Sequence, residues 1–351
     1  MSTMPDRNTL GSTLIAAQTG SRTAARRAAG AALACVFAWV GPSIAADAPG
    51  AWPSRPIRAV LPVPPGGVID NTMRVIVEAL SARLGQQLVI ENHPGANGAI
   101  GAQLVANAPA DGHTMLAAVD GTMMVSLNPR LFPAAPVSTL RDLAPVTKLG
   151  DFGLVLVAHP SLKARTLAEF VALARRTGDT YGFGTSGIGS TTHLAGEMLA
   201  QRTGIVLSHI PYKGGGQALT DVLGGQIPLI MTTVPTAQQY VKAGRLVGLG
   251  VSSPRRSAGL PEVGTYAEQG IADFDVSGWV GIFMPVKTPA PIVEKLQREI
   301  AAVLSLPEIR ARYAEIGMEP SGLPVAEFIR EIRVGSERWA EVVARGRINL
   351  Q

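Results

Sequence analysis

The sequence has little of what disulfide frameworks, thiol enzymes and metal centres require. Its 351 residues include one cysteine, Cys35, and five histidines, none of which form a pair with metal-binding spacing. One cysteine cannot form an internal disulfide, and Cys35 falls in a segment that we expect to be removed. Cysteine nucleophiles and cysteine or histidine metal sites are therefore excluded, and no metal is expected.

Long apolar runs are also scarce, and the clearest one lies near the N-terminus. Arg22, Arg26 and Arg27 precede an apolar run over residues 28–40, and the small residues Ser43–Ala45 follow it. This pattern is typical of an export signal, and the run is too short to span a membrane. We predict that residues 1–46 form a signal peptide that is cleaved after export.

Charge of either sign is low. Only 16% of the residues are charged and 46% are hydrophobic, which is enough apolar material for a core of about two domains. The formal net charge is +5, but removal of residues 1–46 leaves 27 basic and 25 acidic residues, a net charge of about +2. A charge this small gives no support for a nucleic-acid partner.

From Trp52 onward, short β-rich runs alternate with amphipathic helices, which indicates an α/β fold with mainly parallel sheets. The first helix is predicted after Asp70, with apolar residues from Met73 to Leu84 on one face and Gly85 at its end. Further strands are predicted at residues 87–91, 114–119, 155–158, 182–184, 207–210, 229–232 and 247–251.

Three more helices are predicted near the C-terminus. One begins at Thr288-Pro289 with proline at its first position, and the next follows a capping box over Ser305–Glu308. The last helix begins at Val325 and has one apolar face. All three need an apolar surface to cover.

Two extended segments, 142–154 and 274–284, have the pattern of crossings between two α/β units. Two crossings mean that one unit is built from discontinuous chain. We predict one lobe from residues 50–150 plus 276–351 and a second lobe from residues 151–275. A protein of this design binds its ligand in the cleft and closes by a hinge motion about the crossings.

The loop Pro64-Pro65-Gly66-Gly67 is the first candidate binding site, because it joins a predicted strand to a predicted helix. Glycines let a ligand approach the main chain, and the N–H groups at a helix start favour an anion. Val63, Pro65, Gly66, Gly67 and Asp70 are therefore candidate ligand-binding residues. The alternative is an ordinary tight strand-to-helix connection.

A second candidate follows the strand at residues 182–184. Residues 182–187 match G-x-G-x-x-G, but no acidic residue ends a second strand about twenty positions later, so a dinucleotide cofactor is rejected. No cofactor of another kind is indicated. Hydroxyl groups and N–H groups could instead converge on an anion here. The candidate residues are Thr185, Ser186, Ser190, Thr191 and His193.

Each of these residues also has a structural interpretation. Thr191 or Thr192 could serve only as the N-cap of the following helix. His193 lies one turn into that helix, where an exposed or capping histidine is a simpler explanation than a general base. The pentapeptide from Gly184 to Ile188 lacks the last glycine of the G-x-S-x-G motif, which argues against Ser186 as a nucleophile.

Two further loops carry polar residues at the ends of predicted strands. Asp120-Gly121-Thr122 follows one strand, and Tyr212-Lys213 precedes a triple glycine after another. Either loop could be a surface turn. Since ligands of open α/β sheets bind at the carboxyl ends of the strands, we predict that these loops border the same cleft.

Seven motifs in this order resemble the substrate-binding proteins of tripartite tricarboxylate transporters, the Bug or TctC-like family. The resemblance covers Trp52 to about Ile348. The motifs are Trp52–Ile57, Pro64–Gly67 with Asp70, Glu91–Gly95, Asp111–Thr114, Leu194–Glu197, Pro211–Gly214 and Leu219–Gln226.

The resemblance implies a two-lobed periplasmic binding protein of the type II-like, Venus flytrap design. It also implies capture of a small organic carboxylate and its delivery to a membrane permease with one small and one large subunit, without catalysis. The ligand could be a di- or tricarboxylate, an amino acid or an aromatic acid. A monomer is expected, because the protein must open, close and dock. In the family, the loop matching residues 63–70 holds the ligand carboxylate through main-chain groups and waters. Loops matching 120–122, 185–192 and Thr232-Thr233 surround the other end.

Departures from the family pattern concern the ligand. Val63 replaces a frequent aromatic residue and His93 a frequent arginine, while Thr232-Thr233 stands where an acidic residue is common. Asp120 conversely replaces a small hydroxyl residue. We hypothesise that Asp120 faces the cleft and accepts a hydrogen bond from an amine, amide or hydroxyl on a ligand that also carries a carboxylate. The alternative is that Asp120 is only a turn residue.

Two other functions remain open at this point. An exported serine esterase could use Ser186 or Ser190 with His193. A sensory receptor could deliver its signal to a membrane signalling partner instead of a permease, since both roles need the same closing cleft.

Overall fold

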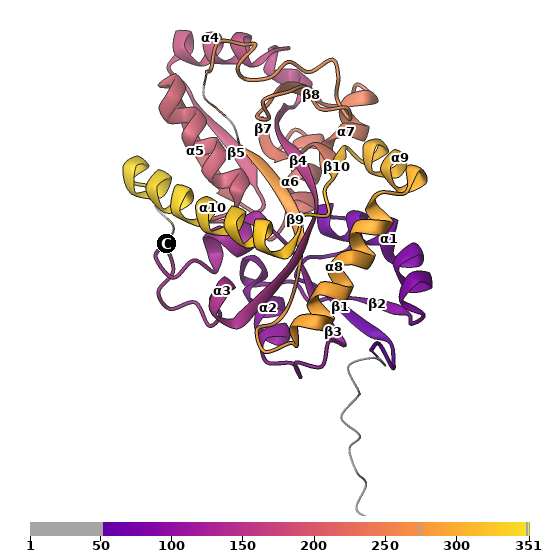
Figure 1. The fold of residues 1–351 in the computed structure, drawn as a ribbon. Coiled ribbons are helices and arrows are strands. Elements are labelled where there is room, and N and C mark those ends of the chain that lie inside the picture. Colours follow the sequence, from indigo (N-terminus) through magenta and orange to yellow (C-terminus); the bar gives the residue numbers. More distant parts are fainter. Residues whose placement is uncertain (1–51, 273, 275, 349, 351) are drawn as a thin grey trace, which may run out of the picture. The chain divides into compact units, whose positions relative to one another are not determined.

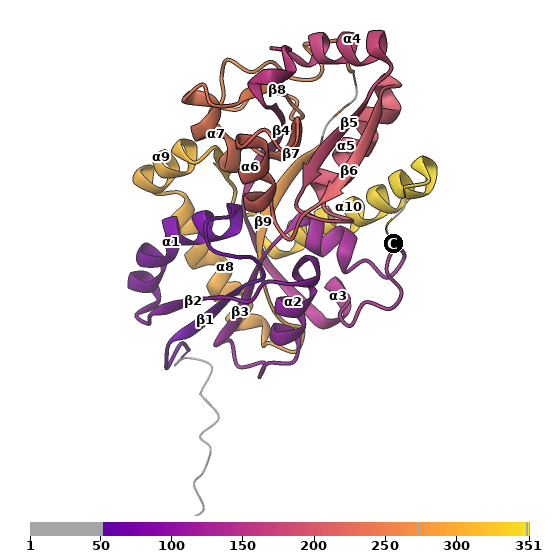
Figure 2. The ribbon, with the colours of Figure 1, turned by 180° about the vertical axis from the view of Figure 1, so that it is seen from behind.

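The computed structural model describes residues 52–272, 274, 276–348 and 350 (Figures 1 and 2). The predicted signal peptide therefore lies outside the described residues. Strands and helices alternate along this part of the chain, as the hydrophobic pattern predicts. Within it, no helix combines the length and the hydropathy that a membrane crossing requires.

The first lobe is built on three parallel strands. β1 lies between β2 and β3, with Ile57 opposite Leu88 and Arg58 opposite Thr114. Helices α1 and α2 pack on these strands, and α8 packs on α1. The elements are β1 Ile57–Leu61, α1 Val68–Leu84, β2 Leu88–Asn92, η1 Ala96–Gly98, α2 Ala99–Ala106, β3 Thr114–Val119, the π-helical turn η2 Gly121–Ser126, and α3 Thr139–Asp142.

The second lobe is built on another parallel trio, in which β5 lies between β6 and β7. Helix α5 packs on all three strands, and α6 packs on β5 and β7. The elements are η3 Pro160–Leu162, α4 Leu167–Thr177, β5 Thr180–Thr185, α5 Thr191–Thr203, β6 Val206–Pro211, α6 Gly215–Leu223, β7 Leu229–Thr233, α7 Val234–Lys242 and β8 Val247–Val251.

Two long strands join the lobes: β4, Leu143–Ala158, and β9, Ser277–Pro285. β4 pairs antiparallel with β9 as far as Gly153, and from Leu154 onward it pairs with β7 and β8. The strand order is β2-β1-β3-β9-β4-β7-β5-β6 (Figure 1). These strands correspond to the predicted crossings. Because they pair antiparallel, the sheet is parallel only within each trio.

The C-terminal segment follows β9. Helix α10 packs on η2 and β4 and also contacts α5 of the second lobe, and Figure 1 shows it lying across the front of the molecule. The elements are α8 Ala290–Leu304, α9 Pro307–Glu315, the short strand β10 Met318–Pro320, which pairs with β4, and α10 Val325–Gly346.

Helix α1 confirms the predicted apolar face. Met73, Ile76 and Leu80 are completely buried, and Gly85 ends the helix with a φ of 68°. A positive φ costs glycine little, which explains why this residue type ends the helix. The helix begins earlier than predicted, because Gly67 is the N-cap and Asp70 lies in the first turn.

The predicted capping box at Ser305 is wrong. Leu306 is the N-cap of α9, and the Ser305 hydroxyl instead donates to the Ala302 carbonyl at 2.7 Å. A residue before proline is restricted to extended conformations, and Leu306 precedes Pro307, so the cap falls one residue later. Helix α8 likewise starts at Ala290, with Pro289 as its N-cap.

Candidate functional site

The loop before α1 is tied to the first lobe by Asp70. The buried Asp70 carboxylate accepts hydrogen bonds from Gly66 N (3.1 Å), Arg74 Nε (2.8 Å) and Asn92 Nδ2 (3.4 Å). Burial opposes ionisation, but the hydrogen bonds from Arg74 and Gly66 outweigh it, so the pKa of Asp70 lies below its ordinary value. Asp70 is therefore an ionised anchor that fixes the loop.

This anchor reduces the number of donors that the loop can offer. The Gly66 N–H is used by Asp70, and prolines have no N–H to donate. The donors that remain for an anion belong to the start of α1, where the first N–H groups have no partner inside the helix. A Cβ at Gly66 would meet nothing within 4 Å, and one at Gly67 would meet only the Pro64 carbonyl at 3.8 Å. There is thus open space beside both glycines.

Val63 and Pro65 lie in the same loop. Val63 is half-buried, and its carbonyl accepts a hydrogen bond from Asn92 Nδ2 at 3.0 Å, while Pro65 is exposed. Asn92 therefore holds both ends of the loop, through the Val63 carbonyl and through Asp70. Sequence reasoning did not single out Asn92 for this role, although it lies in one of the family motifs.

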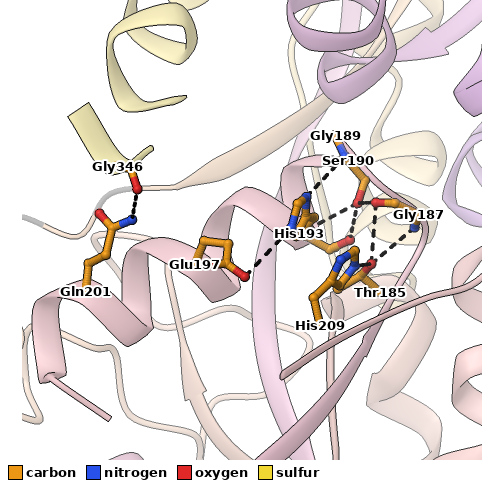
Figure 3. A network of polar contacts seen from close by, with 10 residues as sticks. Thr185, Gly187, Gly189, Ser190, His193, Glu197, Gln201, His209 and Gly346 are labelled. Carbon is orange, nitrogen blue, oxygen red and sulfur yellow. Dashed lines mark hydrogen bonds and ion pairs between the residues drawn. The ribbon is translucent and has the colours of Figure 1, made fainter. Parts of the chain in front are cut away.

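The loop before α5 is held together by its own hydroxyl groups (Figure 3). Ser190 is the N-cap: its Oγ accepts from His193 N at 3.1 Å and donates to the Gly187 carbonyl at 2.7 Å. Thr192 Oγ1 lies 2.9 Å from Ser190 Oγ and 3.1 Å from Ser186 Oγ. The prediction that Thr191 or Thr192 caps this helix is therefore wrong.

His193 is buried beside a second histidine. Its ring stacks on His209 with centroids 3.8 Å apart, and its Nδ1 accepts from Gly189 N at 3.1 Å (Figure 3). His209 Nε2 lies 2.6 Å from Thr185 Oγ1. Burial lowers the pKa of both imidazoles to about 4, and for His209 the proximity of His193 adds to the effect. Both rings are neutral at pH 7. The prediction of an exposed His193 is wrong, whereas its bond to the Gly189 N–H, just before the helix, is of the capping kind.

The geometry does not form a serine nucleophile and its base. Activation requires a hydrogen bond between the hydroxyl and the base. Among the hydrogen bonds of the described residues, the Ser186 and Ser190 hydroxyls contact Thr192 and the Gly187 carbonyl, and neither reaches a nitrogen of the His193 ring. The esterase interpretation has no geometric support.

Asp120 and Gly121 lie where the first lobe contacts the second. The buried Asp120 Oδ2 accepts from Thr191 Oγ1 at 2.6 Å, and Oδ1 lies 3.4 Å from Trp279 N. Burial raises the pKa of Asp120 to about 6, although the bonds from Thr191 and Trp279 oppose the shift. Asp120 thus contacts protein groups in this structure, and its predicted contact with a ligand stays a prediction.

Thr122 leads to another contact between the lobes. Its Oγ1 donates to the Asn97 carbonyl at 3.0 Å, and the Asn97 side chain donates to the Ile188 carbonyl of the second lobe. Asn97 has a φ of 49°, a left-handed conformation that asparagine tolerates. Sequence reasoning missed Asn97, and the signal that could have found it is its position between glycines at a loop turn.

The remaining predicted residues have their own partners. The Tyr212 hydroxyl donates to Asp221 Oδ2 at 2.6 Å, and burial together with this contact raises its pKa to about 12. Lys213 is exposed. Thr233 is the N-cap of α7, and Thr232 is buried, with its Oγ1 3.5 Å from the position that a Cβ of Gly215 would take.

The structure thus joins some of the predicted residues and leaves others apart. Asp120 and Gly121 meet Thr191, and the hydroxyls of Thr185, Ser186, Ser190 and Thr192 form one network with Gly187 and His193. The described contacts of the Val63–Asp70 loop are with β2 and α1 instead. Two hollows, of about 880 and 460 Å³, are lined by other residues. In the described part of the chain, no cluster of three His, Cys, Asp or Glu side chains could hold a metal ion.

The fold is similar to that of the periplasmic binding protein BugD, with a TM-score of 0.79 at 29% identity, covering 86% of this chain and 100% of that one. An R. palustris protein solved with adipate has a TM-score of 0.80 at 29% identity, covering 84% of this chain and 98% of that one. MatC from Rhodopseudomonas palustris, solved with bound malate, has a TM-score of 0.76 at 28% identity, with coverages of 83% and 100%. The fold therefore defines the class as a two-lobed periplasmic binding protein.

The family follows from the sequence comparison. The tripartite tricarboxylate transporter family receptor (TctC) profile matches residues 72–348. Protein BugT of Bordetella pertussis is 35% identical over 293 residues, which are 83% of this chain and 89% of BugT. This chain belongs to the TctC family of receptors, as the motifs predicted.

Proposed function

We propose that this protein is a periplasmic receptor that captures a small dicarboxylate or related organic acid and delivers it to a permease with one small and one large subunit. The feature that supports the proposal is the start of α1, where the first N–H groups have no partner inside the helix and the Cβ positions of Gly66 and Gly67 are open, apart from the Pro64 carbonyl at 3.8 Å. Family membership and the adipate and malate found in related structures support the same ligand class.

The proposal includes three further points. The protein is exported with removal of residues 1–46, it works as a monomer, and it releases its ligand chemically unchanged. The neutral, buried ring of His193, which forms no hydrogen bond with the Ser186 or Ser190 hydroxyl among the described contacts, supports the absence of catalysis.

A ligand screen tests the proposal. We expect adipate, malate or another di- or tricarboxylate to raise the unfolding temperature of the purified protein. At a ligand concentration of 100 times the Kd, the free energy of unfolding should rise by about 2.7 kcal/mol. Isothermal titration gives the affinity, and chromatography of the recovered ligand checks that it is unchanged. The proposal fails if no carboxylate in the panel stabilises the protein, or if a bound ligand is converted.

Two glycine variants test the role of the loop. Gly66 and Gly178 both have a positive φ, 87° and 69°, and a Cβ at either would meet nothing within 4 Å. Alanine at either position is therefore expected to lower the free energy of unfolding by a similar amount, about 1 kcal/mol. Only Gly66 lies beside the proposed donors.

Gly66→Ala is consequently expected to weaken dicarboxylate affinity about tenfold, because its methyl group would occupy the open space beside these donors. Gly178 lies at the end of α4 in the second lobe, so Gly178→Ala should bind the ligand as the parent protein does. Titration of both variants with the best ligand of the screen checks this. Equal affinities would show that the loop before α1 does not hold the ligand.

A further inference from the structure

Asp120 lies where three distant segments meet. It directly follows β3 of the first lobe, and only 1% of its surface is exposed. The crossing strand β9 makes room for it, because a Cβ at Gly278 would lie 2.9 Å from Asp120 Oδ1. Trp279 of the same strand directs its N–H toward this oxygen.

The third segment is the start of α5 in the second lobe. Thr191 Oγ1 donates to Asp120 Oδ2 at 2.6 Å, a short hydrogen bond of the charge-assisted kind. Gly121 permits this approach, because a Cβ there would lie 2.7 Å from Thr191 Oγ1 and 3.0 Å from Thr191 N. The main chain of the first lobe is thus in direct contact with the N-terminus of α5.

Away from the crossing segments, other side-chain hydrogen bonds also join the two sides, and they are of a different kind. Asn97 donates to the Ile188 carbonyl, Gln201 to the Gly346 carbonyl at 3.2 Å, and Gln238 to the Glu315 carbonyl at 2.9 Å. Each is exposed or partly buried and pairs a neutral amide with a carbonyl. Water can replace such bonds with little loss when the lobes separate. The Asp120–Thr191 bond is buried and has a carboxylate acceptor.

We propose that Asp120 and Thr191 form a latch between the lobes, which holds the end of β3 against the start of α5 in the closed receptor. The inference rests on the proposed receptor function and adds a positioning pair to it. Asp120 acts on ligand binding through Thr191, because opening of the lobes must break this bond before the cleft is accessible. Loss of the latch shifts the population toward the open form.

Distance measurements between the outer strands test the latch without any ligand. Val89 on β2 and Val206 on β6 are exposed and lie on the two edge strands of the sheet. Replacing both with cysteine in a Cys35→Ser background allows spin labelling at these positions alone. Pulsed electron paramagnetic resonance then gives the distribution of distances between the lobes.

Thr191→Val removes the hydroxyl and keeps the shape, and Thr192→Val is its matched control. Both threonines are 6% exposed, but the Thr192 hydroxyl bonds only within its own loop among the described contacts. We expect Thr191→Val and Asp120→Ala to shift the ratio of open to closed molecules about tenfold toward longer distances. Thr192→Val and Thr191→Ser should match the parent. Identical distributions for Thr191→Val and Thr192→Val overturn the latch.

Titration of the same variants with adipate and malate separates the two proposals. If neither acid binds the parent but Thr191→Val still lengthens the distances, the ligand class is wrong and the latch stands. If an acid binds and the distances do not change, the latch is wrong and the receptor function stands. Circular dichroism confirms that each variant is folded before either comparison is made.

Discussion

Gly196→Ala is expected to destabilise the protein by about 2 kcal/mol, although alanine is the better helix former. Gly196 lies in α5, and a Cβ there would be 2.1 Å from a ring carbon of Phe183 on β5. Phe183 is completely buried and cannot move aside into solvent. Overpacking of this kind costs about 1–3 kcal/mol, while the helix propensity of alanine returns at most about 1 kcal/mol.

Gly216→Ala is the matched control for this prediction. Gly216 lies in α6, and a Cβ there would meet nothing within 4 Å, so only the helix propensity acts and the variant should be slightly more stable. Urea unfolding of both variants measures the difference. A Phe183→Leu substitution should recover part of the loss in Gly196→Ala, because the smaller side chain relieves the overlap. Equal effects at the two glycines would contradict the steric explanation.

The contact of Gly196 with Phe183 also bears on the site. Helix α5 carries Ser190 and Thr191 at its start, so its distance from β5 determines where these hydroxyls lie. The family motif Leu194–Glu197 identified this segment in the sequence without revealing its physical reason. We interpret the glycine of this motif as a requirement of close packing, because α5 lies directly against the Phe183 ring of β5.

The sequence predicted the features that depend on local pattern. Apolar spacing found α1 and its buried face, and the extended segments 142–154 and 274–284 found the two strands that join the lobes. Glycine loops at strand ends located the polar segments of the candidate site. Each of these signals lies within about 20 neighbouring residues and reports which face is buried.

Contacts between distant segments could not be predicted in this way. Asp120 is buried because Gly278, far along the chain, leaves space for it, and His193 is buried because His209 stacks on it. Hydrophobic spacing shows that a face is covered but not which polar group covers it. This is why His193 was expected at the surface and why the contact of Asp120 with Thr191 was not predicted.

Stability between pH 7 and pH 4 is expected to depend on two opposed titrations. Burial lowers the pKa of His193 and of His209 from 6.5 to about 4, so the folded state resists their protonation. The stabilisation that results from this shift is complete above pH 6.5 and is lost as the pH falls from 6.5 to 4. For His193 the shift corresponds to roughly 3 kcal/mol of unfolding free energy.

The titration of Asp120 changes the free energy of unfolding in the opposite direction over the same pH range. Burial raises its pKa from 3.8 to about 6, so the folded state holds the proton more tightly than the unfolded chain does. Its contribution is complete below pH 3.8 and is lost as the pH rises through 6. The parent protein should therefore lose less stability in acid than its histidines alone would cause.

Two asparagine variants separate these contributions. In His193→Asn the amide oxygen can accept from Gly189 N as the ring nitrogen does, without titrating, so the loss of stability toward pH 4 should be smaller than in the parent. In Asp120→Asn the amide can accept from Trp279 N and donate to Thr191 Oγ1. This variant should gain up to about 3 kcal/mol at pH 7 and lose stability more steeply toward pH 4.

Urea unfolding at pH 7, 6, 5 and 4 measures the three profiles. Buried groups away from the two sites, such as Asp151, whose pKa burial also raises, are common to all three proteins and cancel in the differences. His209, which stacks on His193, and Glu197, 3.8 Å from it, titrate together with His193, so the His193→Asn difference reports on this group as a whole. The two difference curves should have slopes of opposite sign between pH 6 and pH 4. Parallel profiles would mean that neither side chain changes its proton affinity on folding, and a fall in the stability of Asp120→Asn at pH 7 would mean that its buried charge stabilises the folded receptor.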